Sequence, residues 1–265
     1  MTVHEYEVAL SEVTLHVAES GPEDAPAVLF LHGWGCDRRA MQRLVAEAAV
    51  HALVPDLRGH GCTGLASTRH TIPAMARDLA ELLGGRGAEP MLVVAHSMGG
   101  NVAVELAICH PELVSALVVL DPAFADPYWA QAQERASDIE ARGSIAVAEN
   151  AHLAVAPGAD PALIALIRES ALQTDPRVLV EALRSTYLDP DSFGHIDDTV
   201  RRLGLLTVPL LALYPDPDRA SRAGSLPVDQ TVVRIADAGH FLGEEQPAAV
   251  WAAVTCWLAG RGTWT

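Results

Sequence analysis

The segment MLVVAHSMGG, from Met91 to Gly100, carries the clearest chemical signal in the sequence. Its apolar first half predicts a buried strand, and a helical pattern follows. Ser97 stands at the junction, with the small residues Ala95 and Gly99 two positions to either side. A sharp turn at Ser97 needs such neighbours, because larger side chains there would collide. The turn exposes the hydroxyl at a helix N-terminus, whose partial positive charge favours a developing anion. The spacing therefore predicts a nucleophilic serine.

A second segment with glycines, LHGWG from Leu31 to Gly35, follows an earlier apolar run. Its glycines permit a turn that brings main-chain N–H groups towards the nucleophile. The N–H groups of Trp34 and of Met98, the residue after Ser97, would then be the two donors that stabilise a tetrahedral intermediate. We therefore expect an oxyanion hole made from these two main-chain groups.

The elements that must position these groups follow from the periodicity of apolar residues. Short, nearly continuous apolar runs alternate with segments whose apolar residues are three and four apart, as in an α/β fold whose parallel sheet has helices on both faces. The predicted strands are 27–31, 52–55, 91–95, 116–120, 209–213 and 231–235, and the predicted helices are 38–48, 72–83, 99–109 and 248–258. Better alternation at 3–9 and 13–18 predicts an antiparallel hairpin at the sheet edge.

A long insertion interrupts this alternation. Residues 123–206 show only helical periodicity, as at 160–172 and 177–187. Such an excursion between two strands should lie over the crevice where open α/β sheets bind ligands. We expect a core of residues 1–122 and 207–265 and a helical cap, or lid, of residues 123–206.

Composition excludes several kinds of partner and chemistry. The formal net charge of −16 opposes binding to nucleic acid or anionic lipid, and no apolar run approaches the roughly 18 to 20 residues of a membrane span. Lysine is absent, which excludes a lysine Schiff base and covalent pyridoxal phosphate. We expect a cytoplasmic protein with a small-molecule substrate, no nucleic-acid or membrane partner, and no cofactor or metal; a homodimer is left open. The scattered cysteines are interpreted as reduced thiols: Cys36, Cys62, Cys109 and Cys256.

Four motifs together resemble those of the α/β-hydrolase family: HGWG at 32–35, DLRGHG at 56–61, AHSMGG at 95–100 and AGHFLGEEQP at 238–247. The resemblance covers nearly the whole chain. It implies an eight-stranded, mostly parallel sheet, an inserted cap, and a catalytic triad of serine, acid and histidine in that order. It also implies that His240, which follows the last strand, is the base, whereas His32, His60 and His96 match structural positions. Ala95 stands where the family usually has glycine.

The triad acid has more than one candidate. The family usually places it in the turn after the seventh strand, which here reads LYPDPD and ends at Asp218. Its position relative to Pro209 favours Asp218 over the alternative, Asp216, although Pro215 replaces the usual glycine. Asp121, at the end of the sixth strand, is a third candidate because some members place the acid there; we interpret it as structural.

The function that the resemblance implies is that of a serine hydrolase. His240 would take the proton of Ser97, and Asp218 would orient the imidazole. We predict cleavage of a carboxylic ester of a small or medium, mostly apolar substrate, and we expect the acidic surface to disfavour strongly anionic substrates. Lactone, thioester or carbon–carbon bond hydrolysis by the same triad, and a noncatalytic ligand-binding role, are the alternatives. Haloalkane dehalogenases and epoxide hydrolases are disfavoured, because they need aspartate in place of Ser97.

Aromatic residues of the expected cap are the candidates for the substrate pocket. Tyr128 and Trp129 are the first choice, with Tyr187 and Phe193 next. Aromatic side chains of a cap also commonly pack against one another.

Overall fold

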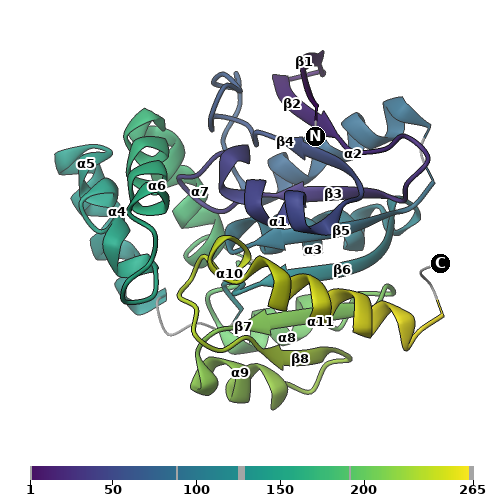
Figure 1. Ribbon diagram of the computed structural model, residues 1–265. Coiled ribbons are helices and arrows are strands. Elements are labelled where there is room, and N and C mark those ends of the chain that lie inside the picture. Colours follow the sequence, from purple (N-terminus) through teal and green to yellow (C-terminus); the bar gives the residue numbers. More distant parts are fainter. Residues whose placement is uncertain (1, 88, 125–128, 191, 263–265) are drawn as a thin grey trace.

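An eight-stranded sheet forms the centre of the protein (Figure 1), in a computed structural model that describes residues 2–87, 89–124, 129–190 and 192–262. The strand order is β1-β2-β4-β3-β5-β6-β7-β8. Strand β2 is antiparallel to its neighbours β1 and β4, and every other neighbouring pair is parallel. The strands are β1 (Val3–Ala9), β2 (Thr14–Ser20), β3 (Ala27–Leu31), β4 (His51–Pro55), β5 (Met91–His96), β6 (Val114–Leu120), β7 (Leu210–Tyr214) and β8 (Thr231–Arg234). The expected mostly parallel sheet with an antiparallel hairpin at its edge is confirmed.

Two apolar layers cover the sheet. Successive strand residues point to opposite faces, so Val93 joins one layer and its neighbours Leu92 and Val94 join the other. The first layer is closed by α2 (Ile72–Arg86) and α3 (Met98–Cys109), and the second by α1 (Gln42–Ala48) and α11 (Pro247–Ala259). Burial on both faces explains why the strands are apolar without alternation.

Four helices that follow β6 lie together at one end of the sheet (Figure 1). They are α4 (Trp129–Arg142), α5 (Ile145–Ala148), α6 (Pro161–Gln173) and α7 (Pro176–Tyr187). Buried side chains of α4, α5 and α7, among them Ile139, Ala146 and Leu183, form a small apolar cluster of their own. We call α4 to α7 the cap helices.

The last helix of the expected cap packs against the core instead. Leu203, at the end of α8 (Ile196–Leu203), belongs to the same apolar layer as α2 and α3, as does Phe193 just before the helix. Arg202 of α8 forms an ion pair with Glu105 of α3. We therefore use the name cap helices for α4 to α7 alone, and the expected cap of residues 123–206 stays a prediction.

Several polar contacts hold the cap helices to the core. The indole Nε1 of Trp34 donates to the carbonyl of Leu179 in α7 at 2.9 Å. The ring of His70 contacts Glu181 of α7 at 2.9 Å, and Ser170 of α6 donates to Asp37 at 2.6 Å. Within the described residues, none of the helices has the length and apolar character to cross a membrane.

The remaining helices are short. Two of them, α9 (Pro217–Gly224) and α10 (Leu242–Glu245), follow β7 and β8, and three 3-10 turns occupy Arg38–Met41, Pro111–Leu113 and Ala151–Ala154. Neither α9 nor α10 follows from the apolar periodicity. Both lie close to the carboxyl ends of the strands, where they position residues described below.

Candidate active site

Ser97 stands at a sharp turn between β5 and α3. Its backbone has φ 52° and ψ −120°, a conformation that a residue with a side chain rarely adopts. A Cβ atom on Gly99 would lie 2.6 Å from the carbonyl oxygen of His32, so this position must be glycine. Ala95, at the other small position, is fully buried in the apolar layer. The turn thus has the steric requirement that the sequence indicated.

The register of the central strands brings Ser97 and Asp121 to the same edge of the sheet. His96 of β5 is paired with Leu120 of β6. The next residue on each strand continues the ladder: Ser97 N–H donates to the carbonyl of Leu120 at 2.9 Å, and Asp121 N–H donates to that of Leu213 at 2.7 Å. Ser97 and Asp121 therefore follow directly from the carboxyl ends of adjacent parallel strands.

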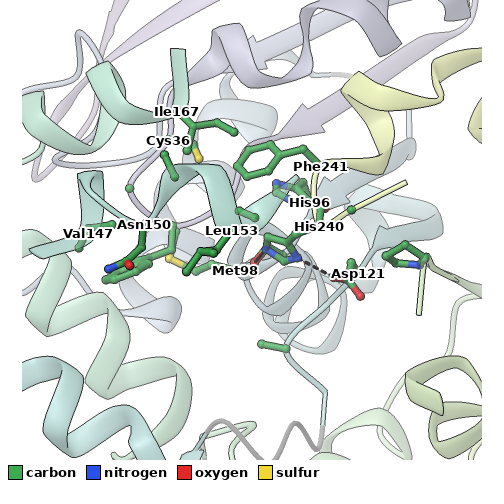
Figure 2. Close-up of a pocket in the computed structure, with 18 of the residues that line it drawn as sticks. Cys36, His96, Met98, Asp121, Val147, Asn150, Leu153, Ile167, His240 and Phe241 are labelled. Atoms are coloured by element: carbon green, nitrogen blue, oxygen red, sulfur yellow. Dashed lines mark hydrogen bonds and ion pairs between the residues drawn. The ribbon is translucent and has the colours of Figure 1, made fainter. Parts of the chain in front are cut away.

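His240 connects these two residues. Its Nε2 lies 2.9 Å from Ser97 Oγ, and its Nδ1 lies 2.6 Å from Asp121 Oδ2 (Figure 2). A carboxylate beside Nδ1 fixes the tautomer in which Nδ1 donates, which leaves the lone pair of Nε2 to accept the Ser97 proton. The three side chains form a continuous relay for removing that proton.

The acid in this relay is not the one expected from the turn after β7. Asp216 is the N-cap of α9: its side chain accepts from the N–H of Arg219 at 2.8 Å, and Pro217 begins the helix. Asp218 lies in the first helical turn and is exposed to solvent. An Asp-Pro pair is a strong helix start, so the chain turns into α9 and the structure does not bring Asp218 to His240. The carboxylate at His240 is that of Asp121, which we expected to be structural.

Arg219 also contacts this carboxylate. Its Nη1 donates to Asp121 Oδ2 at 2.8 Å and its Nη2 to the carbonyl of Pro122 at 3.0 Å. The same carboxylate oxygen therefore accepts from both Arg219 and His240. Arg219 therefore fixes the orientation of the Asp121 carboxylate. Helix α9, whose N-cap is Asp216, positions Arg219 for this contact. Sequence reasoning missed this arginine, because nothing local to it indicates a contact with β6.

The expected oxyanion donors lie beside Ser97. Trp34 is the second residue of a turn closed by the N–H of Cys36 donating to the carbonyl of Gly33 at 3.3 Å, a bond that does not use the Trp34 N–H. Met98 is the first residue of α3, where helical geometry provides no partner for its N–H. A Cβ on Gly33 would lie 3.2 Å from Ser97 Cβ, so the turn packs directly against the nucleophile.

The loop that carries His240 is held from two sides. His240 N–H donates to the carbonyl of Ala154, in the segment between the cap helices α5 and α6, at 2.8 Å. On the other side, His96 Nε2 lies 2.9 Å from the carbonyl oxygen of His240. Burial lowers the pKa of His96 well below its ordinary value, so its ring is neutral and Nε2–H is the donor. His96 thus has the structural role expected of it, in support of the base.

Glu245 links the same loop to the cap segment. Its Oε1 accepts from Gly239 N–H at 3.0 Å and its Oε2 from Ala156 N–H at 2.8 Å. A Cβ on Gly239 would lie 2.5 Å from the main chain of Val155 and Ala156. The backbone beside His240 therefore packs directly on the backbone of the cap. The motif at 238–247 contained this glutamate, but its partner in the cap could not be predicted from spacing.

A cavity of about 720 Å³ opens above Ser97, His240 and Asp121, between the cap helices and the ends of the strands. Its wall is largely apolar and includes Val147, Leu153, Ile167 and Phe241 (Figure 2). Among the aromatic residues expected there, Tyr187 lines the cavity, whereas Phe193 is buried and stacked on Phe124 in the core. Tyr128 and the side chain of Trp129 lie outside the described part of the structure.

The DLRGHG segment has a structural role in the described residues. Asp56 accepts from the N–H and the Nη1 of Arg38 and from Cys62 N–H, at 2.7, 2.8 and 2.9 Å. His32 bridges from Gly33 to Leu57. Within the described residues, no cluster of three or more potential metal ligands occurs.

Comparison with known proteins agrees with the fold. A family model described as "Alpha/beta hydrolase family" matches residues 28–253. The chain is 27% identical over 259 residues to the mouse "sn-1-specific diacylglycerol lipase ABHD11", covering 90% of this chain and 83% of that protein. A thermophilic esterase from Thermogutta terrifontis superposes with a TM-score of 0.80 at 25% identity, over 99% of this chain and 100% of that one.

A stronger but shorter similarity joins the chain to "Lipase LipV" of Mycobacterium tuberculosis. The two are 42% identical over 114 residues, which is 43% of each protein. The chain thus matches less than half the length of this relative, and the match to "Magnesium-chelatase 30 kDa subunit" of Rhodobacter capsulatus covers 34% of that protein.

Proposed function

The chain belongs to the alpha/beta hydrolase family, and on that premise we propose that it is a serine hydrolase that cleaves carboxylic esters through an acyl-enzyme on Ser97. One observation carries the proposal: the hydrogen-bonded series Ser97, His240 and Asp121, with distances of 2.9 and 2.6 Å, at the floor of a largely apolar cavity. A nucleophile, a base within reach of its proton and an acid that orients the base are what acyl transfer requires.

The proposed mechanism begins with proton transfer. His240 Nε2 takes the proton of Ser97 as the serine oxygen attacks the ester carbonyl. Asp121 stabilises the imidazolium that forms, and His240 then gives the proton to the departing alcohol. Water repeats the cycle on the acyl-enzyme and releases the acid.

The tetrahedral intermediates need donors for their oxyanion. We assign this role to the N–H groups of Trp34 and Met98, which stand on the turn and on the helix end that flank Ser97. Donors of this kind each contribute on the order of 3 kcal/mol to the transition state.

We further propose that the cap helices α4 to α7 form the roof of the substrate site. Cap residues Val147, Leu153 and Ile167 line the cavity together with Ser97 and His240. A small or medium ester with an apolar acyl or alcohol part suits such a wall. Lactones, thioesters and carbon–carbon bonds would use the same relay, and no feature of the described cavity favours them over esters.

Covalent labelling tests the proposal. A fluorophosphonate probe should modify the wild-type protein at Ser97, and Ser97→Ala and His240→Ala should both abolish labelling and turnover of p-nitrophenyl acyl esters. Cys109→Ala, a change at an exposed thiol at the end of α3, is the matched control and should leave labelling intact. Wild-type protein without labelling, or a Ser97→Ala variant with full turnover, would refute the serine hydrolase.

A further inference from the structure

Arg135 of α4 lies in the wall of the catalytic cavity. Ala132, Ala136 and Ile139 are fully buried, and residues at this spacing share one helix face with Arg135. That face is directed into the protein, and Arg135 is half-buried on it. Its guanidinium carbon lies 5.8 Å from the centre of the Trp34 ring, and Trp34 belongs to the turn that flanks Ser97.

The hydrogen-bonding capacity of Arg135 is not used within the described chain. Its Nε is buried and has no hydrogen-bond partner there, and no described carboxylate forms an ion pair with it. An N–H removed from water without an acceptor is costly, and more so when it carries charge. The side chain therefore lacks an acceptor that a ligand could supply.

Three acidic residues of the cap pair with other arginines. Glu149 and Asp138 pair with Arg142, and Glu140 pairs with Arg184. The pKa of Glu149 is lowered mainly by its hydrogen bond from Arg142, and the charge of Arg135 contributes least. Arg135 is thus left with its positive charge directed at the cavity.

The other arginine in the cavity wall, Arg219, is already bonded to Asp121 and to the carbonyl of Pro122. Apolar side chains of the cap, such as Leu153 and Ile167, form part of the cavity wall (Figure 2). A ligand matched to this surface combines a hydrocarbon part with one anionic end.

We propose that Arg135 is a specificity-determining residue that binds a carboxylate of the substrate, so that the preferred esters carry a second, ionised carboxyl group. Guanidinium binds carboxylate with two parallel, charge-assisted hydrogen bonds, and Arg135 stands in the cavity wall, where a substrate carboxylate can accept them. The inference rests on the proposed ester hydrolysis and deepens it. It also revises the expectation that the acidic surface disfavours anionic substrates, because Arg135 places a positive charge in the cavity wall.

A purely structural role for Arg135 makes a different prediction. If the guanidinium only braced α4 against Trp34, its removal would loosen the cap and lower the turnover of charged and uncharged esters by the same factor. A carboxylate anchor instead changes the preference between the two. The ratio of kcat/KM values for matched esters is therefore the informative quantity.

The experiment compares monomethyl esters of straight-chain dicarboxylic acids, from glutaric to suberic, with methyl esters of the monocarboxylic acids of equal length. We expect Arg135→Gln to lower the ratio of kcat/KM for the charged series to that for the uncharged series roughly 10- to 100-fold. Arg135→Lys keeps the charge without the two parallel donors, so its ratio of kcat/KM values should lie between those of wild type and Arg135→Gln. Arg168→Gln removes the same charge from an exposed position on α6 and should leave the ratio unchanged. An unchanged ratio in Arg135→Gln overturns the anchor.

A binding measurement separates this inference from the proposed function. In a Ser97→Ala background, the monomethyl esters should raise the melting temperature of the protein with Arg135 and not that of Arg135→Gln. If wild-type protein hydrolyses neither series, ester hydrolysis fails, while a selective shift in melting temperature still supports the anchor. If both proteins show equal shifts, the anchor is overturned whether or not esters are hydrolysed.

Discussion

Replacement of Asp121 by asparagine isolates the contribution of the acid's negative charge. Asparagine has the same shape, and it tolerates the left-handed backbone of this position, where φ is 45°. The Nη1 of Arg219 donates to the Oδ2 site at 2.8 Å, so the amide oxygen rather than the NH₂ group should occupy that site. The oxygen still accepts from His240 Nδ1, and the productive tautomer is kept.

The magnitude follows from the geometry. With Asp121 ionised, the imidazolium formed during catalysis lies 2.6 Å from a negative oxygen. At an effective dielectric constant of about 20, unit charges at this separation attract by about 6 kcal/mol. The charge of Arg219 partly offsets that attraction in the wild type and repels the imidazolium in the variant. We expect kcat/KM to fall about 10³- to 10⁴-fold.

The assay is steady-state hydrolysis of a p-nitrophenyl ester by Asp121→Asn, Asp216→Asn and Asp218→Asn, with melting temperatures to verify folding. Asparagine is as good an N-cap as aspartate, and Asp218 is exposed, so the last two variants should stay within about threefold of wild type. Full activity in Asp121→Asn, or a loss in Asp218→Asn as large as that in Asp121→Asn, would refute the assignment of the acid.

Three further outcomes are expected. Gly33→Ala places a Cβ 2.9 Å from His96 Nδ1 and 3.2 Å from Ser97 Cβ, so it should displace the oxyanion turn and lower kcat on the order of 10²-fold; an unchanged kcat contradicts this packing. Burial raises the pKa of Glu181, but hydrogen bonds from the main chain and ring of His70 outweigh it and bring the pKa from 4.5 to about 2. The stability that Glu181 contributes is then present above about pH 4.5 and lost towards pH 2. On acidification the melting temperature of wild type should therefore fall further than that of Glu181→Gln. Parallel curves of melting temperature against pH would exclude the contact. Burial raises the pKa of Glu244 to about 7 against hydrogen bonds from the N–H groups of Arg43 and Leu44. Its ionised form therefore destabilises the fold increasingly from about pH 4.5 to 7, and Glu244→Gln should melt above wild type at about pH 8 and converge with it near pH 5; a constant difference would argue against the raised pKa.

The sequence contained enough information to predict the sheet and to select Ser97 and His240, whose side chains the structure places 2.9 Å apart. The strands are continuous apolar runs because both faces are buried, and Ser97 is marked by the small residues that its turn requires. His240 follows the last strand, so its position relative to the sheet is set by the local chain. Each of these features depends on residues close in sequence.

The acid could not be chosen in this way, because Asp121 and Asp218 both come after an apolar strand. Their roles depend on whether the chain after the strand keeps the side chain at the sheet edge or turns it outward. The pair Asp216 and Pro217 is a local signal of the helix start that turns Asp218 outward, and it could have been used. The contact of Arg219 with Asp121 joins two strand ends, and no local pattern contains it.

The boundary of the cap illustrates the same limit. Helix α8 has the amphipathic pattern of the cap helices, and periodicity alone cannot tell which surface its apolar side contacts. In the structure, Leu203 joins the apolar layer of the core, and Arg202 forms an ion pair with Glu105 of α3, so helix α8 packs on α3. These partners lie far away in sequence, so no local pattern predicts the contacts between them.

The contact between Ala154 and His240 limits how this protein can be re-engineered or regulated. The segment from Ala154 to Ala156 accepts the N–H of His240 and shares Glu245 with Gly239, so removing the roof also removes a support of the base. A chimera that exchanges the roof for that of another hydrolase must retain these three residues as part of the catalytic floor. Under the proposed function, a substitution that moves the segment 154–156 to alter substrate choice also moves the backbone that holds His240.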